Sequence, residues 1–386
     1  MSDDSFTEVS STSWFGRIGE SIKGILFGVV LVGAAVFLIF WNEGRAVNRA
    51  KTLSEGSKNV ISVSAETVDP ANEGKLVHLV AKATTTETLA DPPFGVSAPA
   101  LKLRRNAEMY QWEQNEHRET KKKLGGGTTT TTTYTYNKKW SDTLIDSSRF
   151  KQPEGHANPQ AMLYSSREQV AQKITAGAFT LSRSLVSRIN NYTDLPFASL
   201  DAIPEATRAK CKLADGRAYF GAEPASPEVG DLRVSFSVLT PETVSLVARQ
   251  VNSTFEPYIS KVGGELELLQ EGEFSAAQMF QQAEHMNTLL TWGLRLGGAL
   301  VMFFGFLLIM RPISVLADVI PLLGNIVEFG TGIIALILAA AISLCTAAVA
   351  WFYYRPLLSI LLVAGAAAFA FGILRLKKRQ VTTLST

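Results

Sequence analysis

The chain has 386 residues, 46% of them hydrophobic, and its formal net charge at pH 7 is +2. This near-neutral balance produces no overall field that would attract nucleic acid, so nucleic acid is not an expected partner. The length allows two or three structural units. The two cysteines, Cys211 and Cys345, lie in a polar region and in an apolar run, so no internal disulfide is expected.

Four apolar runs predict transmembrane helices. About 20 apolar residues in a helix are enough to cross the ~30 Å hydrocarbon core of a bilayer. The first run is too long for a signal peptide and lacks a small-residue cleavage site. The predicted spans are residues 24–41, 291–310, 330–351 and 356–374.

Basic residues after the last run predict the orientation. The stretch "RLKKRQ", residues 375–380, indicates that the tail at residues 375–386 is cytoplasmic. Four spans then place the N-terminus in the cytoplasm as well, and residues 42–290 on the luminal or periplasmic side. A few basic residues after the first run favour the opposite orientation, but long domains cross membranes largely regardless of their charge.

The segments on either side of the first span have helical spacing. Residues 1–23 are predicted to be a cytoplasmic tail, in which an apolar face over residues 14–22 indicates a short interfacial helix; a disordered tail is the alternative. Residues 46–53 keep helical spacing up to Gly56, so the first span is predicted to continue beyond the membrane as a stalk.

Residues 42–290 are predicted to form a β-rich extracytoplasmic domain with a few helices. Alternating apolar residues and turn residues favour a small barrel or a sandwich, and an OB-like barrel is one option. Residues 125–127 indicate a hairpin turn between two long strands, and helices are expected at residues 166–174 and 182–190. Strands are expected within residues 59–64, 74–85, 100–119, 128–145, 174–181, 216–221, 231–239, 242–251 and 264–270. The predicted fold class is therefore an α+β membrane protein, with this domain between its first and second of four transmembrane helices.

Two further features lie near the second span. Ser275 and Gln278 have the spacing of a capping box, at the start of a helix expected to run into that span. Residues 311–329 are apolar but interrupted by Pro312, Pro321 and Gly324, which predicts a cytoplasmic interfacial segment or a re-entrant one.

The stretch "PEVGDLRVSFSVL", residues 227–239, combines charges with an alternating pattern. Glu228, Gly230, Asp231 and Arg233 could suggest an active site. However, Gly230 indicates a turn, and the following alternation indicates a half-buried strand. A turn carboxylate at Asp231 can bond backbone N–H groups, so a structural role is predicted for these residues.

A second stretch mixes cations with aromatic residues. Arg104, Arg105, Tyr110 and Trp112 could contact acidic lipid headgroups or another anionic partner. The alternative is a solvated strand face on which the neighbouring glutamates balance the charge.

Small residues within the spans predict close helix packing. Gly24 and Gly28 in the first span, and Gly293 and Gly297 in the second, have the small-xxx-small spacing. This spacing allows packing within one chain or between copies. Arg295 lies a few residues into the second span and is expected to extend to the membrane surface.

The chain contains no recognisable catalytic motif. Its four histidines lack metal-ligand spacing, and no nucleophile elbow, Cys–His pairing or phosphate loop is visible. No catalytic residue, metal ligand or cofactor is therefore predicted, and enzymatic activity is not expected. A metal site would require the fold to bring His156 close to carboxylates such as Asp142 or Glu154.

Several long strings, in order from about residue 41 to about residue 358, resemble the transmembrane protein 43 family, also called LUMA. The resemblance implies four spans and a large luminal loop, and it supplies no catalytic residues. It also implies self-association and, for animal members, the endoplasmic reticulum and inner nuclear membrane, lamins, emerin and membrane organisation. The strings are "NEGRAVNRA", "NEGKLVHLV", "DPPFGVSAPALKLRRNAEMYQW", "GHANPQAM", "PEVGDLRVSFS", "GEFSAAQMF", "TWGLR" and "FYYRPL".

Together these observations predict a non-enzymatic multi-pass membrane protein with both termini in the cytoplasm. It would form homo-oligomers and organise a membrane region through membrane lipids or an unidentified membrane or envelope protein. The expected location is the plasma (inner) membrane in a bacterium, and the endoplasmic reticulum or inner nuclear membrane in a eukaryote. The alternative is a membrane-bound sensor or enzyme whose outer domain binds a small ligand or a metal.

Overall fold

The computed structural model describes residues 5–357, 359–361 and 364. The chain forms two compact units, and each is built from segments that are distant in the sequence. The β-rich unit consists of Met1–Ser10, Glu55–Thr120 and Thr130–Gln281. The helical unit consists of Ser11–Ser54, Lys121–Thr129 and Gln282–Thr386.

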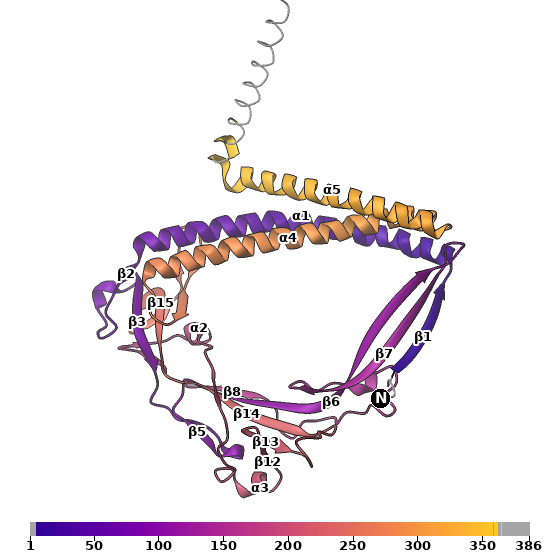
Figure 1. Ribbon diagram of the computed structural model, residues 1–386. Helices are drawn as coiled ribbons and strands as arrows, with labels where there is room; N and C mark the ends of the chain where they lie inside the picture. The colour runs from indigo at the N-terminus through magenta and orange to yellow at the C-terminus, as the bar shows by residue number, and fades with distance from the viewer. Residues whose placement is uncertain (1–4, 358, 362–363, 365–386) are drawn as a thin grey trace, which may run out of the picture. The chain divides into compact units, whose positions relative to one another are not determined.

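Three long helices dominate the helical unit: α1 (Trp14–Asn59), α4 (Ala276–Ala317) and α5 (Pro321–Tyr354), seen side by side in Figure 1. Each is long and apolar enough to cross a membrane. At 1.5 Å per residue, α1 is about 69 Å long, so it extends well beyond a ~30 Å hydrocarbon core. The predicted helical continuation through residues 46–53 is present, because α1 runs through them without a break, and their position outside the membrane stays a prediction. The predicted interfacial helix is the first part of the same helix.

Small residues bring α1 and α4 close together. A Cβ atom added to Gly28 would lie 2.6 Å from the carbonyl oxygen of Gly305, and one added to Gly298 would lie 2.6 Å from Ile39. Only glycine permits such an approach of two helix backbones. Beside these contacts Ala35, Ile39, Met302 and Ala339 form a buried core that also includes α5.

The structure has no separate segment at residues 311–329. Helix α4 continues through Pro312 to Ala317, and α5 begins at Pro321, so three residues form the connection. Proline is well suited to the first turn of a helix because its missing N–H would have no helical partner there. The third predicted span lies inside α5. The fourth predicted span, apart from a few of its first residues, and the basic tail lie outside the described residues, so the count of four spans is not confirmed.

The β-rich unit contains two open sheets. The first has the strand order β1-β7-β6-β14-β13-β12, with β11 added to β14 and β8 added to β6. Its strands are β1 (Ser5–Thr12), β6 (Lys102–Lys122), β7 (Thr128–Ser141), β8 (Arg167–Val170), β11 (Thr193–Leu195), β12 (Lys212–Ala214), β13 (Arg217–Phe220) and β14 (Leu232–Leu239).

The second sheet has the order β10-β9-β3-β15-β16, with β19 paired to β15 and β2 paired in parallel to β3. Its strands are β2 (Ile61–Ser62), β3 (Leu76–Thr84), β9 (Thr175–Ala176), β10 (Phe179–Thr180), β15 (Glu242–Val251), β16 (Thr254–Glu256) and β19 (Leu268–Glu271). The remaining short elements are β4 (Leu89–Asp91), β5 (Val96–Ala98), β17 (Tyr258–Ile259), β18 (Glu265–Leu266), α2 (Arg183–Val186), α3 (Glu205–Arg208) and the 3₁₀ turns η1 (Pro70–Asn72), η2 (Pro92–Phe94) and η3 (Ser147–Arg149).

One hydrophobic core serves both sheets. It combines Leu79 and Leu246 of the second sheet with Leu103 and Phe236 of the first, and all four are at most 2% exposed. Among the described residues neither path of paired strands returns to its first strand. The predicted barrel, including its OB-like form, is therefore not confirmed.

Each predicted strand range contains a strand, and several further strands lie where none was expected. Residues 166–174 were expected to be helical, but Arg167–Val170 form β8, which pairs with β6. The pairing sets Arg104 opposite Glu168, and pairing with β6 along the whole segment outweighs the weak local helical pattern. Another such strand is β1, which occupies part of the tail in which no strand was expected. The predicted helix at residues 182–190 corresponds to α2, and the capping box of Ser275 and Gln278 is formed at the start of α4.

Candidate functional site

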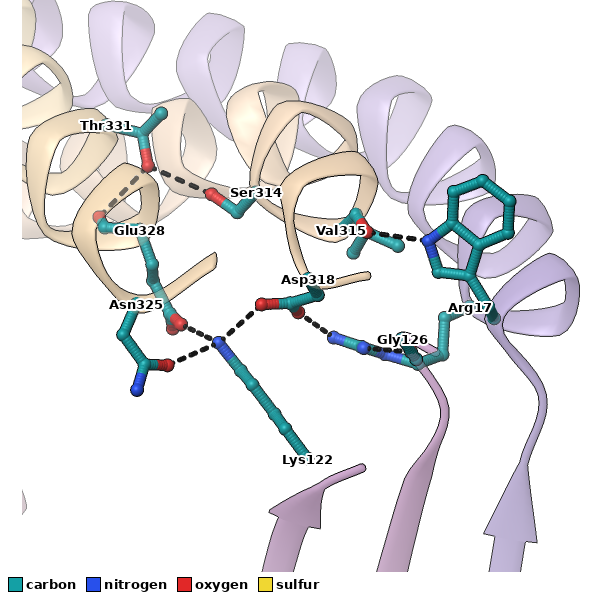
Figure 2. A network of polar contacts seen from close by, with 10 residues as sticks. Arg17, Lys122, Gly126, Ser314, Val315, Asp318, Asn325, Glu328 and Thr331 are labelled. Carbon is teal, nitrogen blue, oxygen red and sulfur yellow. Dashed lines mark hydrogen bonds and ion pairs between the residues drawn. The ribbon is translucent and has the colours of Figure 1, made fainter. Parts of the chain in front are cut away.

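A network of polar contacts lies at the turn between α4 and α5, within the helical unit (Figure 2). At its centre is Asp318, whose side chain is 1% exposed. Its Oδ2 atom accepts a hydrogen bond from Nη2 of Arg17 at 2.5 Å, and its Oδ1 atom lies 2.9 Å from Nζ of Lys122. The carboxylate is therefore buried but paired with two cations, as a buried charge requires.

The cations of this network come from the start of α1 and from the hairpin tip, which we define as residues 121–129, the last residues of β6, the turn and the first residues of β7. Lys122 also donates to Oε2 of Glu328 at 2.6 Å and to Oδ1 of Asn325 at 3.0 Å, both on α5. Arg17 also donates from Nη1 to the carbonyl oxygen of Gly126 at 2.5 Å. Burial lowers the pKa of Lys122, but its hydrogen bonds to Glu328 and Asp318 outweigh burial and raise that pKa above its ordinary value.

Backbone contacts fix the hairpin tip in the same place. The amide of Gly125 donates to the carbonyl oxygen of Val319 at 3.1 Å. Gly126 has a φ of 79°, and a Cβ atom there would overlap the indole of Trp14. That indole donates from Nε1 to the carbonyl oxygen of Val315 at 2.9 Å. The predicted turn at residues 125–127 is thus present, and glycine is needed there for both conformation and space.

This network bears on the orientation of the chain in the membrane. Lys122 belongs to the segment between α1 and α4, whereas Asp318 follows α4. The predicted orientation places residues 42–290 and residues 311–329 on opposite sides of the membrane. An ion pair requires both groups on one side, so the network and a complete crossing by α4 exclude one another.

A second polar cluster lies at the other end of the apolar part of the helix pair. Glu43 of α1 is completely buried, and its two carboxylate oxygens accept hydrogen bonds from Nε and Nη2 of Arg295 at 2.6 and 2.9 Å. Nε1 of Trp351 on α5 donates to Oε2 of the same carboxylate at 2.9 Å. Arg295 was expected to extend to the membrane surface, but its charge is neutralised within the bundle by Glu43 instead. The sequence signal for this pair is one acid just after the first apolar run and one base just inside the second.

Further polar side chains continue this cluster along α1 and α4. Arg45 donates to Oδ1 of Asn287 and to Oγ1 of Thr291, both at 3.0 Å. Asn42 donates from Nδ2 to the carbonyl oxygen of Thr291 at 3.0 Å. These bonds satisfy buried polar groups that would be costly in an apolar environment.

The four glycines predicted to pack helices lie in different surroundings. Gly28 contacts Gly305, and a Cβ atom at Gly24 would make an ordinary contact with Leu308. In contrast, Gly293 and Gly297 have open space in the direction of a Cβ atom. Among the described residues, the face of α4 that carries Gly293 and Gly297 therefore packs against no other part of the chain.

The stretch at residues 228–233 forms the turn before β14 and the start of that strand. Oδ2 of Asp231 accepts hydrogen bonds from the backbone N–H of Glu228 at 2.8 Å and from the hydroxyl of Tyr219. Burial and this hydrogen bond raise the pKa of Tyr219. Gly230 has a φ of 101°, which favours glycine. Arg233 donates from Nε to Glu108 at 2.7 Å.

The predicted anionic-partner residues all have partners within the β-rich unit. Nη1 of Arg105 lies 3.0 Å from both carboxylate oxygens of the buried Asp91. Nη2 of Arg104 donates to Oε2 of Glu168 at 2.6 Å. The rings of Tyr110 and Trp112 pack against Trp140 and His156. The charges of both arginines are thus balanced inside the chain, and binding of an anionic partner stays a prediction.

The structure does not form the metal site that was considered for His156. Its imidazole is 3% exposed and stacks on Tyr136 at a centroid distance of 3.8 Å. In the described part of the chain, no three His, Cys, Asp or Glu side chains come close enough together to hold a metal ion.

One cavity in the β-rich unit could hold a small ligand. Its volume is about 430 Å³, and its lining includes Lys102, Arg104 and Glu168. Lys102 donates from Nζ to the carbonyl oxygen of Ile189 at 2.7 Å, and burial lowers its pKa. Burial raises the pKa of Glu168, but hydrogen bonds from Arg104 and Tyr192 outweigh burial and lower it.

These features define a class of protein: an integral membrane protein whose described residues include three apolar helices, with a large β-rich region between the first two. The comparisons with known proteins identify the family. The family model described as Transmembrane protein 43 matches residues 109–356. The chain therefore belongs to the transmembrane protein 43 family.

Relatives in animals match nearly the whole chain. Transmembrane protein 43 of Rattus norvegicus is 37% identical over 90% of this chain and 88% of its own length. The Homo sapiens protein is 36% identical over 93% of this chain and 91% of its own. The Drosophila melanogaster homolog is 33% identical over 90% of this chain and 93% of its own. No solved structure matches the chain significantly.

Proposed function

We propose that this protein is a non-enzymatic membrane organiser that self-associates through its helices. Its β-rich region would bind a membrane or envelope protein, or lipids, and several copies would gather these partners in one membrane region. The observation that carries the proposal is an open small-residue face on α4. Among the described residues Gly293 and Gly297 have no neighbour, and the large apolar side chains beside them are exposed: Trp292 by 64% and Leu296 by 65%.

The physical argument concerns close helix packing. Within the chain, the contact of Gly28 with Gly305 shows how α4 packs where glycine meets glycine. The same spacing at Gly293 and Gly297 would allow a second copy to approach equally closely. In the membrane, van der Waals contact between such faces is a main source of helix association.

The native size of the full-length protein in detergent and in lipid nanodiscs tests this proposal. Wild-type protein should be larger than a monomer, and a Gly293→Ile/Gly297→Ile double variant should shift toward the monomer. Gly19→Ile is the matched control, because Gly19 of α1 also has open space around it but lies outside the apolar run. A wild-type protein that stays monomeric at high concentration would exclude self-association.

The cellular location is part of the same proposal. In a nucleated cell the protein would reside in the endoplasmic reticulum and inner nuclear membrane, and in a bacterium in the plasma (inner) membrane, with both termini in the cytoplasm. Fluorescence microscopy of a tagged protein in its own source cell tests the compartment. Protease protection of tags at the two ends tests the orientation.

The cavity of about 430 Å³ favours a second candidate function, a sensor whose β-rich region binds a small ligand. Lys102 and Arg104 would supply positive charge to an acidic ligand. Thermal-shift screening of acidic metabolites tests this function. A hit that Lys102→Met removes would support it, and a screen without hits would leave the organiser as the better account.

A further inference from the structure

A cavity of about 540 Å³ lies within the helical unit, beside the pair of Glu43 and Arg295. Its size falls within the range of about 300–1,000 Å³ that is typical of small-molecule sites. All three long helices contribute to it. The lining includes Ala46 of α1, Asn287, Trp292 and Arg295 of α4, and Trp351 and Arg355 at the end of α5.

The cavity lies where the apolar runs of all three helices end. The run at residues 24–41 ends just before Ala46, and the run at residues 291–310 begins near Trp292. The apolar part of α5 ends at Tyr354, three residues after Trp351. Tryptophan is enriched at the level of the lipid headgroups because its ring is apolar and its N–H is polar. The cavity therefore lies where the apolar surface of these helices gives way to polar side chains, which is the pattern of a boundary between hydrocarbon and headgroups.

The charges around the cavity favour an anion. Arg295 is neutralised by Glu43, with its guanidinium 4.7 Å from the centre of the Trp292 ring. Arg355 is half-buried, and no acidic side chain pairs with it among the residues that the structure describes. A guanidinium without a counter-ion is well suited to two-point hydrogen bonding with a phosphate.

One acidic residue of the lining limits the choice of anion. Glu284 is exposed at the edge of the cavity, two turns of α4 before Thr291. Its carboxylate would repel a second negative charge and would attract an amine. A headgroup that carries one phosphate and one ammonium group matches Arg355 and Glu284 together.

We propose that this cavity is a phospholipid site, which binds the phosphate of a zwitterionic headgroup such as phosphoethanolamine. Arg355 holds the phosphate, Glu284 faces the ammonium group, and Trp292 and Trp351 pack against the glycerol region. Basic pockets between membrane helices bind lipid headgroups by the same chemistry. The site belongs to a single chain and does not depend on self-association.

Native mass spectrometry of the full-length protein, stripped of lipid in a phosphate-free detergent, tests the proposal. Titration with phosphatidylethanolamine should load one lipid per chain. Arg355→Gln should weaken binding about tenfold or more, because it removes a charge-assisted hydrogen bond. Arg355→Lys keeps the charge without the planar fork and should weaken binding less. Arg311→Gln is the matched control, since Arg311 is exposed at the other end of α4 and should leave binding unchanged.

Two further arms define the ligand. Wild-type protein should prefer phosphatidylethanolamine to phosphatidylglycerol, and Glu284→Gln should remove that preference. Inorganic phosphate at millimolar concentration should not displace the lipid. Equal lipid binding by wild type and folded Arg355→Gln would overturn the proposal. Displacement of the lipid by inorganic phosphate would show that the site binds free phosphate rather than the phosphate of a lipid headgroup.

Discussion

Glu43 and Arg295, 252 positions apart in the sequence, form a two-point ion pair at 2.6 and 2.9 Å with the carboxylate completely buried. The pair connects α1 to α4 where both helices leave their apolar runs. An unpaired charge in such an environment is expensive, so the pair must form whenever the two helices associate. It therefore selects one register of α1 against α4.

Removal of one partner of this pair should destabilise the helical unit strongly. Arg295→Met leaves the Glu43 carboxylate buried without its cation, at an expected cost of about 3–5 kcal/mol. The Glu43→Gln/Arg295→Met double variant should recover much of this loss, because no uncompensated charge is left and glutamine can still accept the bond from Trp351. Thermal unfolding in detergent measures both effects. Additive losses in the double variant would contradict a direct pair, and Arg311→Met serves as the control.

The network around Asp318 predicts that the hairpin tip and the α4–α5 turn lie on the same side of the membrane. In a variant without Cys211 and Cys345, single cysteines replace Leu124 in the hairpin tip or Leu322 at the start of α5, which are 87% and 71% exposed. A membrane-impermeant maleimide added to sealed vesicles should then label both positions or neither. Labelling of one position alone would show that α4 crosses the membrane completely and that Lys122 does not reach Asp318 in the bilayer.

Substitution of Asp231 should lower the stability of the β-rich region rather than change its binding of a partner. Asp231→Ala leaves the hydroxyl of Tyr219 and the backbone N–H of Glu228 without their acceptor, at an expected cost of about 1–3 kcal/mol. The thermal unfolding of the β-rich region measures this loss. Glu228→Ala is the control, because the Glu228 side chain is exposed and its removal should change stability by about 0.5 kcal/mol or less. A loss of partner binding without a loss of stability would instead indicate that Asp231 belongs to a binding or active site.

Glu168 should make the β-rich region less stable in acid. Its pKa in the folded protein lies below the ordinary value of 4.5, because hydrogen bonds from Arg104 and Tyr192 outweigh burial. As the pH falls, Glu168 therefore binds a proton in the unfolded chain before it does so in the folded protein. Its contribution to the free energy of unfolding is complete above about pH 4.5 and is lost as the pH falls through its pKa in the folded protein. Denaturant unfolding of wild type and Glu168→Gln at pH 6 and pH 3.5 measures it. The effect should be small, since the side chain is 38% exposed, and identical pH dependence in both proteins would refute it.

Features that depend on local pattern were predictable. The first three apolar runs correspond to α1, α4 and α5, and the alternating segments at residues 74–85 and 231–239 correspond to β3 and β14. The capping box of Ser275 and Gln278 also depends on spacing alone. In each case the signal is the repeat of a single helix or strand, which neighbouring residues determine.

Features that depend on partners from distant segments were not predictable. Arg167–Val170 has a weak helical pattern, but pairing with β6 makes it a strand. Arg105 was assigned to a surface, and only the position of Asp91 makes it an inward-facing ion pair. The segment at residues 311–329 was expected to be interfacial or re-entrant, whereas α4 continues through Pro312 to Ala317 and α5 begins at Pro321.

The sequence by itself determined the membrane class, the first three apolar helices and the β-rich character of the region between the first two, because hydrophobic length and periodicity are properties of one segment. Only the tertiary structure decided which charges meet. The partners of Glu43, Asp318 and Lys122 follow from the relative register of helices and of the hairpin tip. Those registers are set by close packing at Gly28 and Gly305 and by the need to neutralise buried charge, which no single segment reveals.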